Sequence, residues 1–442
     1  MFFFVFLHLE TGSIVGMKKA FLIAAASSGS GKTTLTCGLL RSLRNKGYKV
    51  QPFKCGPDYI DPLYHRIASD RDSINLDTWM QTPQQVQENF SRYAQEADIC
   101  IIEGVMGLYD GTDGIKGSSA EVAELLNVPV ILVINAHSMA HSIAPILKGY
   151  LTYRPSTQIA GVIFNNVGSS RHEQILRLAA AEVGMPVLGA VPRMKELYAP
   201  SRHLGLDISE TEKIDQMAEN VAEVLDSTFI DTILNSQFSI LNLSPSLQER
   251  AGVGPSMFNS ESPKGLIYIA RDAAFNFLYR QTIDYLCQQG EVHFFSPIAN
   301  EMVPQDADFV FLPGGYPEFF LQQLSQSHDT MESLRKTHAR IWAECGGMMY
   351  LSQGIDQTDM VGLLPFSTTM QNARLHLGYR TMMMNGKELR GHEFHYSSIV
   401  GTPPSSSTQL YDVQGQPVDT GFYIQGNIYA GYTHWLHPYS IL

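Results

Sequence analysis

The sequence predicts an α/β protein of two domains, an N-terminal P-loop domain built on a parallel sheet and a C-terminal α/β domain. The chain has 442 residues, which is enough for two or three domains. Short apolar runs alternate with helix-like stretches up to about residue 230, and the pattern starts again at residue 266. Residues 236–264 are rich in Ser, Pro and Gly and have no sustained periodicity, which is typical of a linker.

The first domain is expected to span residues 17–235. Near-continuous apolar runs between helices are typical of a parallel sheet whose two faces are both covered. The predicted strands are 20–26, 48–54, 98–103, 128–134, 159–164 and 186–191, and the predicted helices include 32–46, 138–151, 170–183 and 212–226.

The second domain is expected to span residues 265–442. Apolar runs typical of strands lie at 266–270, 291–295, 308–312 and 340–344, with helical segments between them. After about residue 356 the pattern predicts short strands and turns. This half of the chain therefore also reads as an α/β sheet.

Residues 1–16 precede the first predicted strand. They contain an apolar run, Phe2 to Leu7, that has no basic residues ahead of it and is too short to span a bilayer. We expect a loose, dispensable extension and take Met17 as the natural start. No later segment approaches 18 consecutive apolar residues, so the sequence predicts no membrane-spanning helix.

Composition excludes several classes of protein. Hydrophobic residues make up 44% and charged residues 17%, which indicates a globular chain. The formal net charge of −12 argues against a nucleic-acid partner, because phosphate backbones attract basic surfaces. The five cysteines are odd in number, widely spaced and without a CxxC pair, which argues against a disulfide framework or a zinc site and favours a reducing cytoplasm.

Residues 26–33, Ala-Ser-Ser-Gly-Ser-Gly-Lys-Thr, match the P-loop pattern except that Ala26 replaces the first glycine. A predicted strand precedes them and a predicted helix follows, although an ordinary Gly/Ser turn is the structural alternative. Small residues let backbone N–H groups approach phosphate oxygens at a helix N-terminus. The pattern predicts ATP and Mg²⁺ as cofactors, with Lys32 at the outer phosphates and Thr33 at the metal. The predicted phosphate-binding residues are Gly29, Ser30, Gly31, Lys32, Thr33 and Thr34.

Acidic residues follow two other strands. Glu103 closes an apolar strand, where side chains commonly face the ligand crevice of an open α/β sheet. Asp58 and Asp61 lie in a turn held by glycine and prolines, and Mg²⁺ prefers such oxygen ligands. A surface loop or a simple turn would explain these carboxylates equally well, and Asp110 is ambiguous in the same way.

Residues 341–347, Ile-Trp-Ala-Glu-Cys-Gly-Gly, predict a strand that runs through Cys345 into a helix. This is the nucleophile-elbow arrangement with cysteine in place of serine. A helix N-terminus is expected to lower the pKa of the Cys345 thiol and so favour the thiolate. Backbone N–H groups of Gly314, Gly315 and Gly346 are candidates for an oxyanion site. The structural alternative is a buried, inert cysteine.

A nucleophilic cysteine needs a base. The second domain offers His392, His395, His434 and His437, and spacing alone does not choose among them.

The two candidate sites together make the chain resemble the cobyrinic acid a,c-diamide synthase family, from about residue 18 to about residue 437. Ordered blocks along nearly the whole chain carry the resemblance and argue against a chance match. They are SSGSGKTT (27–34), KCGPDYIDPLYH (54–65), EGVMGLYDG (103–111), FNNVGSSRHE (164–173), VPRM to SRHLGL (191–206), ARDAAFNF (270–277), LPGGYPE (312–318), AECGGMMYL (343–351), GHEFHYS (391–397) and GYTH (431–434).

The resemblance implies a dethiobiotin-synthetase-like ATPase domain joined to a class I, triad-type glutamine amidotransferase domain. It implies amidation of the a- and c-acetate side chains of a cobyrinate-like macrocycle in cobalamin biosynthesis. ATP phosphorylates a carboxylate, and ammonia from glutamine displaces the phosphate. A homodimer is our hypothesis for the assembly, and neither nucleic acid nor membrane is expected as a partner.

The resemblance also assigns roles to single residues. Cys345 matches the glutamine-attacking cysteine, and His434 matches the family's histidine better than His395 or His437. The remaining matches are Thr33, Asp61 and Glu103 as metal ligands, Asp58, Tyr59 and Asp110 at the substrate, and Asn165 at adenine. Two positions depart from the pattern. Cys55 stands where an apolar residue is common, and no glutamate lies two residues after His434, so the group that orients this histidine is unassigned.

Three other interpretations stay open from the sequence. Cobyric acid synthase shares the layout but amidates other side chains, and the ring substrate could instead be hydrogenobyrinate or nickel-sirohydrochlorin. A different class is a MinD/ParA-type ATPase switch with a dead second domain. Ser27 counts against the switch, because it occupies the place of the signature lysine of those proteins.

Overall fold

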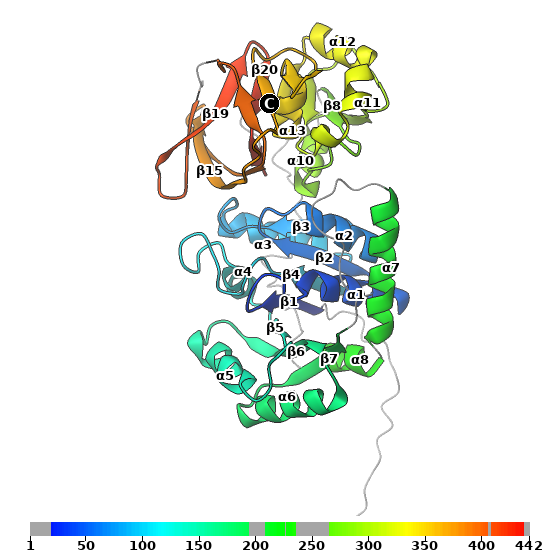
Figure 1. Ribbon diagram of the computed structural model, residues 1–442, viewed down its shortest axis with the longest axis vertical. Coiled ribbons are helices and arrows are strands. Elements are labelled where there is room, and N and C mark those ends of the chain that lie inside the picture. The colour runs from blue at the N-terminus through cyan, green and yellow to red at the C-terminus, as the bar shows by residue number, and fades with distance from the viewer. Residues whose placement is uncertain (1–18, 194–207, 226, 236–264, 405–407, 437–442) are drawn as a thin grey trace, which may run out of the picture.

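A seven-stranded sheet organises the first half of the computed structural model, which describes residues 19–193, 208–225, 227–235, 265–404 and 408–436 (Figure 1). The strand order is β3-β2-β4-β1-β5-β6-β7, and all neighbours are parallel. The strands are β1 (Lys19–Ala25), β2 (Val50–Cys55), β3 (Ile74–Leu76), β4 (Ile99–Glu103), β5 (Val130–Asn135), β6 (Ile159–Val167) and β7 (Val187–Pro192). The chain crosses from β4 over β1 to β5, and ligands bind at such switch points in open α/β sheets.

Helices cover both faces of this sheet, because its strands are apolar on both sides. One face packs against α3 (Pro83–Ala94), α4 (Ser119–Leu126), α5 (Ile143–Tyr153) and α6 (Ser170–Glu182). The other packs against α1 (Lys32–Asn45), α2 (Ile60–Ser69), α7 (Ile208–Val224) and α8 (Ser227–Asn235). The two faces therefore bury separate hydrophobic cores.

A ten-stranded mixed sheet organises the second half, in the order β21-β16-β15-β18-β19-β20-β11-β10-β8-β9. The five strands from β20 to β9 are parallel, and the others pair antiparallel. The strands are β8 (Leu266–Ala270), β9 (Glu291–Phe295), β10 (Phe309–Leu312), β11 (Arg340–Glu344), β15 (His376–Met384), β16 (Lys387–His395), β18 (Thr408–Tyr411), β19 (Pro417–Gln425), β20 (Ile428–Gly431) and β21 (Thr433–Trp435).

Smaller elements complete this domain. A four-stranded sheet contains β12 (Gly354–Ile355), β13 (Thr358–Asp359), β14 (Ser367–Thr369) and β17 (Ser398–Val400). The helices are α10 (Arg280–Gln289), α11 (Leu321–Gln326), α12 (His328–Lys336) and α13 (Gly346–Leu351), with a 3₁₀ turn η2 at Pro317–Phe319. None of the described helices is long and apolar enough to cross a bilayer.

The predicted α/β class and its strands are confirmed, with three differences. The helix predicted from residue 138 begins at Ile143, because Ser138 adopts a left-handed conformation that a helix does not accept. The three-residue edge strand β3 was not predicted. After residue 356 the expectation of short strands is wrong in part, because β15, β16 and β19 have nine residues each.

The second domain docks on the β2–β3 edge of the first sheet (Figure 1). Gln281 donates to the Asn75 carbonyl at 2.7 Å, and the Tyr379 hydroxyl donates to the Asp77 carboxylate at 2.7 Å. Aromatic and apolar side chains from both halves form one buried cluster there, namely Tyr59, Trp79, Met80, Phe277, Tyr279 and Leu436. The extension 1–16, the linker 236–264 and His437 lie outside the described residues, so the predicted domain boundaries stay a prediction.

Candidate active site

The loop between β1 and α1 has the backbone of a phosphate loop. Gly29 and Gly31 have φ of 75° and 94°, which side chains with a Cβ rarely adopt. The Asn165 side-chain amide donates to the Ser30 carbonyl at 3.0 Å. A Cβ on Gly31 would lie only 2.1 Å from Nδ2 of Asn165. Asn165 therefore lies against the loop itself, and its predicted contact with adenine stays a prediction.

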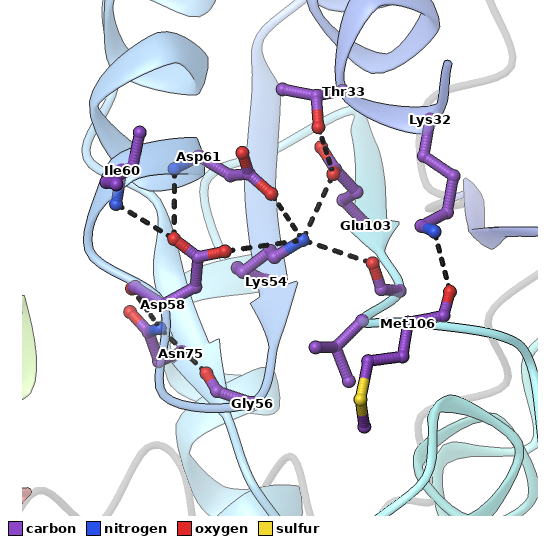
Figure 2. A network of polar contacts seen from close by, with 12 residues as sticks. Lys32, Thr33, Lys54, Gly56, Asp58, Ile60, Asp61, Asn75, Glu103 and Met106 are labelled. Atoms are coloured by element: carbon purple, nitrogen blue, oxygen red, sulfur yellow. Dashed lines mark hydrogen bonds and ion pairs between the residues drawn. The ribbon is translucent and has the colours of Figure 1, made fainter. Parts of the chain in front are cut away.

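Side chains at the start of α1 reach the neighbouring strand. The Lys32 ammonium donates to the Met106 carbonyl at 2.6 Å, and the Thr33 hydroxyl donates to Glu103 at 2.8 Å (Figure 2). Thr34 follows on the same helix and is partly buried. The P-loop hydroxyl and the carboxylate that ends β4 thus meet at the carboxyl edge of the sheet.

A buried ammonium lies at the centre of this edge. Lys54 Nζ lies 2.7 Å from Asp61, 3.0 Å from Glu103 and 3.9 Å from Asp58 (Figure 2). Burial alone would lower the pKa of Lys54, but Asp61 and Glu103 outweigh it and raise the pKa. Three carboxylates surround one ammonium, so the cluster keeps an excess of negative charge.

Glu103 is fully buried and also contacts His65, whose Nε2 lies 2.6 Å from its carboxylate. Burial alone would raise the pKa of Glu103, but Lys54 and then His65 hold it well below the usual range. The carboxylate is therefore ionised and shared among Thr33, Lys54 and His65, instead of facing an open crevice as the sequence suggested.

The cluster fits a magnesium ion bound together with phosphates. Mg²⁺ typically uses one or two protein carboxylates and completes its shell with phosphate oxygens and water. The described residues hold no group of three or more His, Cys, Asp or Glu arranged for a metal. Thr33, Glu103 and Asp61 provide a hydroxyl and two carboxylates, which is a donor set of the size that such a shared site needs.

Two predicted substrate residues have structural contacts of their own. The Asp58 carboxylate accepts the backbone N–H groups of Ile60 and Asp61, at 2.8 and 3.1 Å, so it caps the start of α2. The Asp110 carboxylate accepts the Gly107 N–H at 2.9 Å within its own loop. Their predicted contacts with substrate stay predictions.

In the second domain, Cys345 occupies a strained turn between β11 and α13. Its φ of 45° and ψ of −106° are unusual for a residue with a side chain, as expected of a nucleophile elbow. The prediction of a lowered thiol pKa is wrong. Burial, followed by Glu318, raises the pKa of Cys345, and the six-residue α13 does not offset this. The resting group is a thiol, so a base must remove its proton.

Two loops meet at the elbow. A Cβ on Gly346 would lie 3.0 Å from the Gly315 nitrogen, and a Cβ on Gly314 would lie 2.1 Å from His434 Cε1. Glycines thus let the loop after β10, the elbow and the His434 ring approach closely. The oxyanion roles of Gly314, Gly315 and Gly346 stay predictions that this close approach supports.

His434 is fully buried, and burial lowers its pKa to about 3, so its ring is a neutral base at physiological pH. His395 is committed elsewhere, because it contacts the Ser397 carbonyl at 2.9 Å and Glu393 at 3.2 Å. His392 pairs with His434 across β16 and β21. These contacts favour His434 over His395 as the base, and the assignment stays a prediction.

The first domain covers the histidine. The Tyr59 ring, next to Asp58 and Asp61 in sequence, packs on His434 with ring centroids 5.2 Å apart. It also stacks on Phe277 at 4.8 Å. Tyr59 was predicted to contact substrate, but this structure buries it between the two candidate sites.

Comparisons with known proteins agree with this two-site arrangement. Residues 21–206 match the family described as CobQ/CobB/MinD/ParA nucleotide binding domain, and residues 266–438 match CobB/CobQ-like glutamine amidotransferase domain. Cobyrinate a,c-diamide synthase of Priestia megaterium is 40% identical and covers 94% of this chain and 93% of its own. The chain belongs to the a,c-diamide synthase family. Hydrogenobyrinate a,c-diamide synthase of Brucella anthropi is 41% identical, with coverage of 86% and 90%.

Membership of this family excludes the MinD/ParA-type switch with a dead second domain. The nucleotide-binding match alone is shared with MinD and ParA, but the relatives extend through both domains. Cobyrinate a,c-diamide synthase of Syntrophotalea carbinolica, for example, is 39% identical and covers 93% of this chain.

Sequence reasoning missed three charged residues in these sites, namely Lys54, His65 and Glu344. Lys54 and Glu344 lie in largely buried strands next to residues that were singled out, Cys55 and Cys345. A charge inside a buried strand signals that it has a partner, but the partner is not readable from sequence. His65 has no comparable signal, because its helix was not predicted.

We expect Lys54→Met to destabilise the first domain by about 3–5 kcal/mol, because Asp61 would lose its buried counter-ion and Glu103 would keep only its contacts with His65 and Thr33. The carboxyl pKa values would then rise, so the loss should be larger at pH 8 than at pH 6. Urea unfolding at the two pH values measures both effects. Lys148→Met, at an exposed position on α5, is the matched control. A loss no greater than that of the control would contradict the buried ion-pair cluster.

Proposed function

We propose that this protein is a glutamine-dependent a,c-diamide synthase that amidates two acetate side chains of cobyrinate or hydrogenobyrinate in cobalamin biosynthesis. The observation that carries the proposal is the near-full-length similarity to enzymes of that activity. The arrangement of the two candidate sites, one in each domain and joined through Tyr59, supports it. The relatives reported above are named for cobyrinate or hydrogenobyrinate, which favours these rings over nickel-sirohydrochlorin and the a and c side chains over those amidated by cobyric acid synthase.

In the first domain, ATP transfers its γ-phosphoryl group to a substrate carboxylate and leaves as ADP. Lys32 and the backbone of the phosphate loop would bind the phosphates, and Thr33, Glu103 and Asp61 would hold Mg²⁺. The ion would neutralise charge on the phosphate oxygens. Lys54 keeps Glu103 ionised and pairs with Asp61.

In the second domain, the Cys345 sulfur attacks the carboxamide carbon of glutamine and forms a thioester, while His434 passes the thiol proton to the departing nitrogen. Water then releases glutamate. Ammonia attacks the acyl phosphate carbon, phosphate leaves, and the product is an amide. Neutral ammonia is the nucleophile, so its path between the domains must avoid protonation by solvent. A cytoplasmic location and a homodimer stay predictions.

A substrate panel tests the proposal directly. Purified protein would receive cobyrinate, hydrogenobyrinate or nickel-sirohydrochlorin with ATP, Mg²⁺ and glutamine, and mass spectrometry would count the amides formed. We expect two amides on one of the first two rings. Amidation of only nickel-sirohydrochlorin, or of positions other than a and c, would overturn the proposed substrate.

Two variants separate the half-reactions. We expect Cys345→Ser to lose glutamine-dependent amidation and to keep amidation driven by ammonium at high pH. Lys32→Ala should lose about 10²-fold or more with either nitrogen source, because phosphoryl transfer precedes the attack of ammonia. Equal loss of the ammonium-driven reaction in a folded Cys345→Ser protein would refute this division of labour.

Tyr59 offers a test of communication between the sites. Tyr59→Ala removes the ring that packs on His434 and Phe277, so we expect more glutamate to be released for each amide formed than in the wild type. Tyr59→Phe keeps the ring and should keep the wild-type ratio. The measurement is the ratio of glutamate to amide at saturating substrates, and an unchanged ratio in Tyr59→Ala would remove Tyr59 from the coupling.

A further inference from the structure

The histidine of the glutaminase site lacks an acid at the position where a Cys-His-Glu triad has one. Two residues after His434 stands Leu436, which is buried and whose carbonyl accepts a hydrogen bond from Thr282. A histidine base works in one tautomer only, with one ring nitrogen carrying a proton and the other free to accept. Some other group must therefore select the tautomer of His434.

One carboxylate faces the ring. Glu344 ends β11 directly before Cys345, and its Oε2 lies 3.7 Å from His434 Nδ1, with both side chains almost completely buried. Among the residues that the structure describes, no other carboxylate forms an ion pair with His434, and neither ring nitrogen has a hydrogen-bond partner. A distance of 3.7 Å exceeds a hydrogen bond, but such contacts often tighten when substrate binds.

Glu344 is also held in place. Its Oε1 accepts the Trp342 indole N–H at 2.9 Å and the Trp435 backbone N–H at 3.3 Å. Both partners belong to the strands that position the site. Trp342 lies on β11, which leads into Cys345, and Trp435 directly follows His434 on β21. One carboxylate oxygen is therefore anchored while the other is directed at the histidine.

The nearest rival is Glu393, which is also buried. Both of its carboxylate oxygens already have partners. Oε2 accepts from Arg380 and, at 3.3 Å, from the Thr420 hydroxyl, and Oε1 lies 3.2 Å from His395 Nε2. This carboxylate organises the β15–β16 hairpin and His395. It is not available to orient His434.

We propose that Glu344 is the positioning residue of the glutaminase site, accepting the Nδ1 proton of His434 and leaving Nε2 to take the proton of the Cys345 thiol. The inference rests on the proposed glutaminase role of Cys345 and His434. As sulfur bonds to the glutamine carbon, the proton moves to Nε2 and then to the nitrogen that departs as ammonia. The ionised form of Glu344 acts here: it takes up no proton in this sequence, and its charge stabilises the transient imidazolium.

The electrostatics of the resting site restrict this role to the ionised form of Glu344. Burial raises the pKa of Glu344 to about 8 and lowers the pKa of His434 to about 3, so the resting pair carries little charge near pH 7, and Glu344 must ionise before it accepts the Nδ1 proton. The other titratable groups that face Glu344 are Cys345, Tyr59 and Tyr279, whose pKa values burial raises. Forming a thiolate and an imidazolium in this buried pocket is costly before substrate enters, which limits reaction of the Cys345 thiol in the absence of glutamine.

Glu344→Gln tests the proposal because it preserves shape. The amide oxygen can still accept from Trp342 and Trp435, but the amide nitrogen would donate to Nδ1 and so favour the tautomer with a proton on Nε2. We expect the glutaminase kcat to fall on the order of 10²-fold or more. Glutamine affinity should stay close to that of the wild type. The rate at which iodoacetamide alkylates Cys345, followed by mass spectrometry of its peptide, should fall as well.

Thermal stability distinguishes a positioning role from a structural one. The folded-state pKa of Glu344, about 8, lies above the unfolded value of roughly 4.3, so the wild type loses stability as pH rises through this window. Glutamine does not titrate, so the melting temperature of Glu344→Gln should equal or exceed that of the wild type at pH 8.5. A merely structural residue would lose stability and activity together. Glu332→Gln, at an exposed position on α12, is the matched control and should change neither.

The outcomes separate this inference from the proposed function. Wild-type glutaminase in Glu344→Gln, together with loss in Cys345→Ser, overturns the positioning role and leaves the proposed function standing. Glutaminase activity in both variants overturns the proposed function. If Glu344→Gln folds poorly, Glu344→Asp provides a second test because it keeps the carboxylate. Iodoacetamide should alkylate Cys345 faster in Glu344→Asp than in Glu344→Gln. Equal inactivity of Glu344→Asp and Glu344→Gln with lowered melting temperatures would overturn the positioning role.

Discussion

The buried ammonium of Lys54 is the interaction on which the first site depends. It lies on β2, yet it holds carboxylates from three places, namely Asp58 in the loop after β2, Asp61 on α2 and Glu103 at the end of β4. A buried charge is tolerated only when it is paired, so these elements cannot move apart independently. The same residues surround the phosphate loop through the contact of Thr33 with Glu103. One chain of polar contacts, from Thr33 through Glu103 and Lys54 to Asp61, therefore connects the phosphate loop with the start of α2.

The start of α2 also determines how the two domains meet. Asp58 caps this helix, and Tyr59 projects into the interface against Phe277 and His434. Asp58, which contacts Lys54, and Tyr59, which packs on His434, are therefore neighbours in sequence. Coupling between two sites requires a physical element that both of them bias, and the loop after β2 is placed to be that element.

The sequence predicted the fold class, six of the seven strands of the first sheet, four parallel strands of the second sheet and the phosphate loop, because apolar periodicity and glycine spacing are local signals. It could not predict which charges would pair. The pKa of Cys345 shows the limit most clearly, since a helix N-terminus is visible in sequence but the burial that outweighs it is not. Likewise Glu344 was visible beside Cys345, while its proximity to His434 arises only when β11 and β21 come together. The nine-residue strands β15 and β16 were missed because their sequences, HLGYRTMMM and KELRGHEFH, do not alternate regularly between apolar and polar residues.

The burial of the glutaminase site also has a consequence for ammonia. His434 and His392 are held neutral by burial, which lowers the pKa of each to about 3, and the interface beside them is lined by Tyr59, Phe277 and Tyr279. An ammonium ion would have to lose its hydration there, whereas neutral ammonia carries no charge. Asp58 and Asp61, which lie beside Tyr59 in sequence, already pair with Lys54. The desolvation that keeps the Cys345 thiol protonated thus also favours neutral ammonia over ammonium. Neutral ammonia is the nucleophile that the proposed amidation needs.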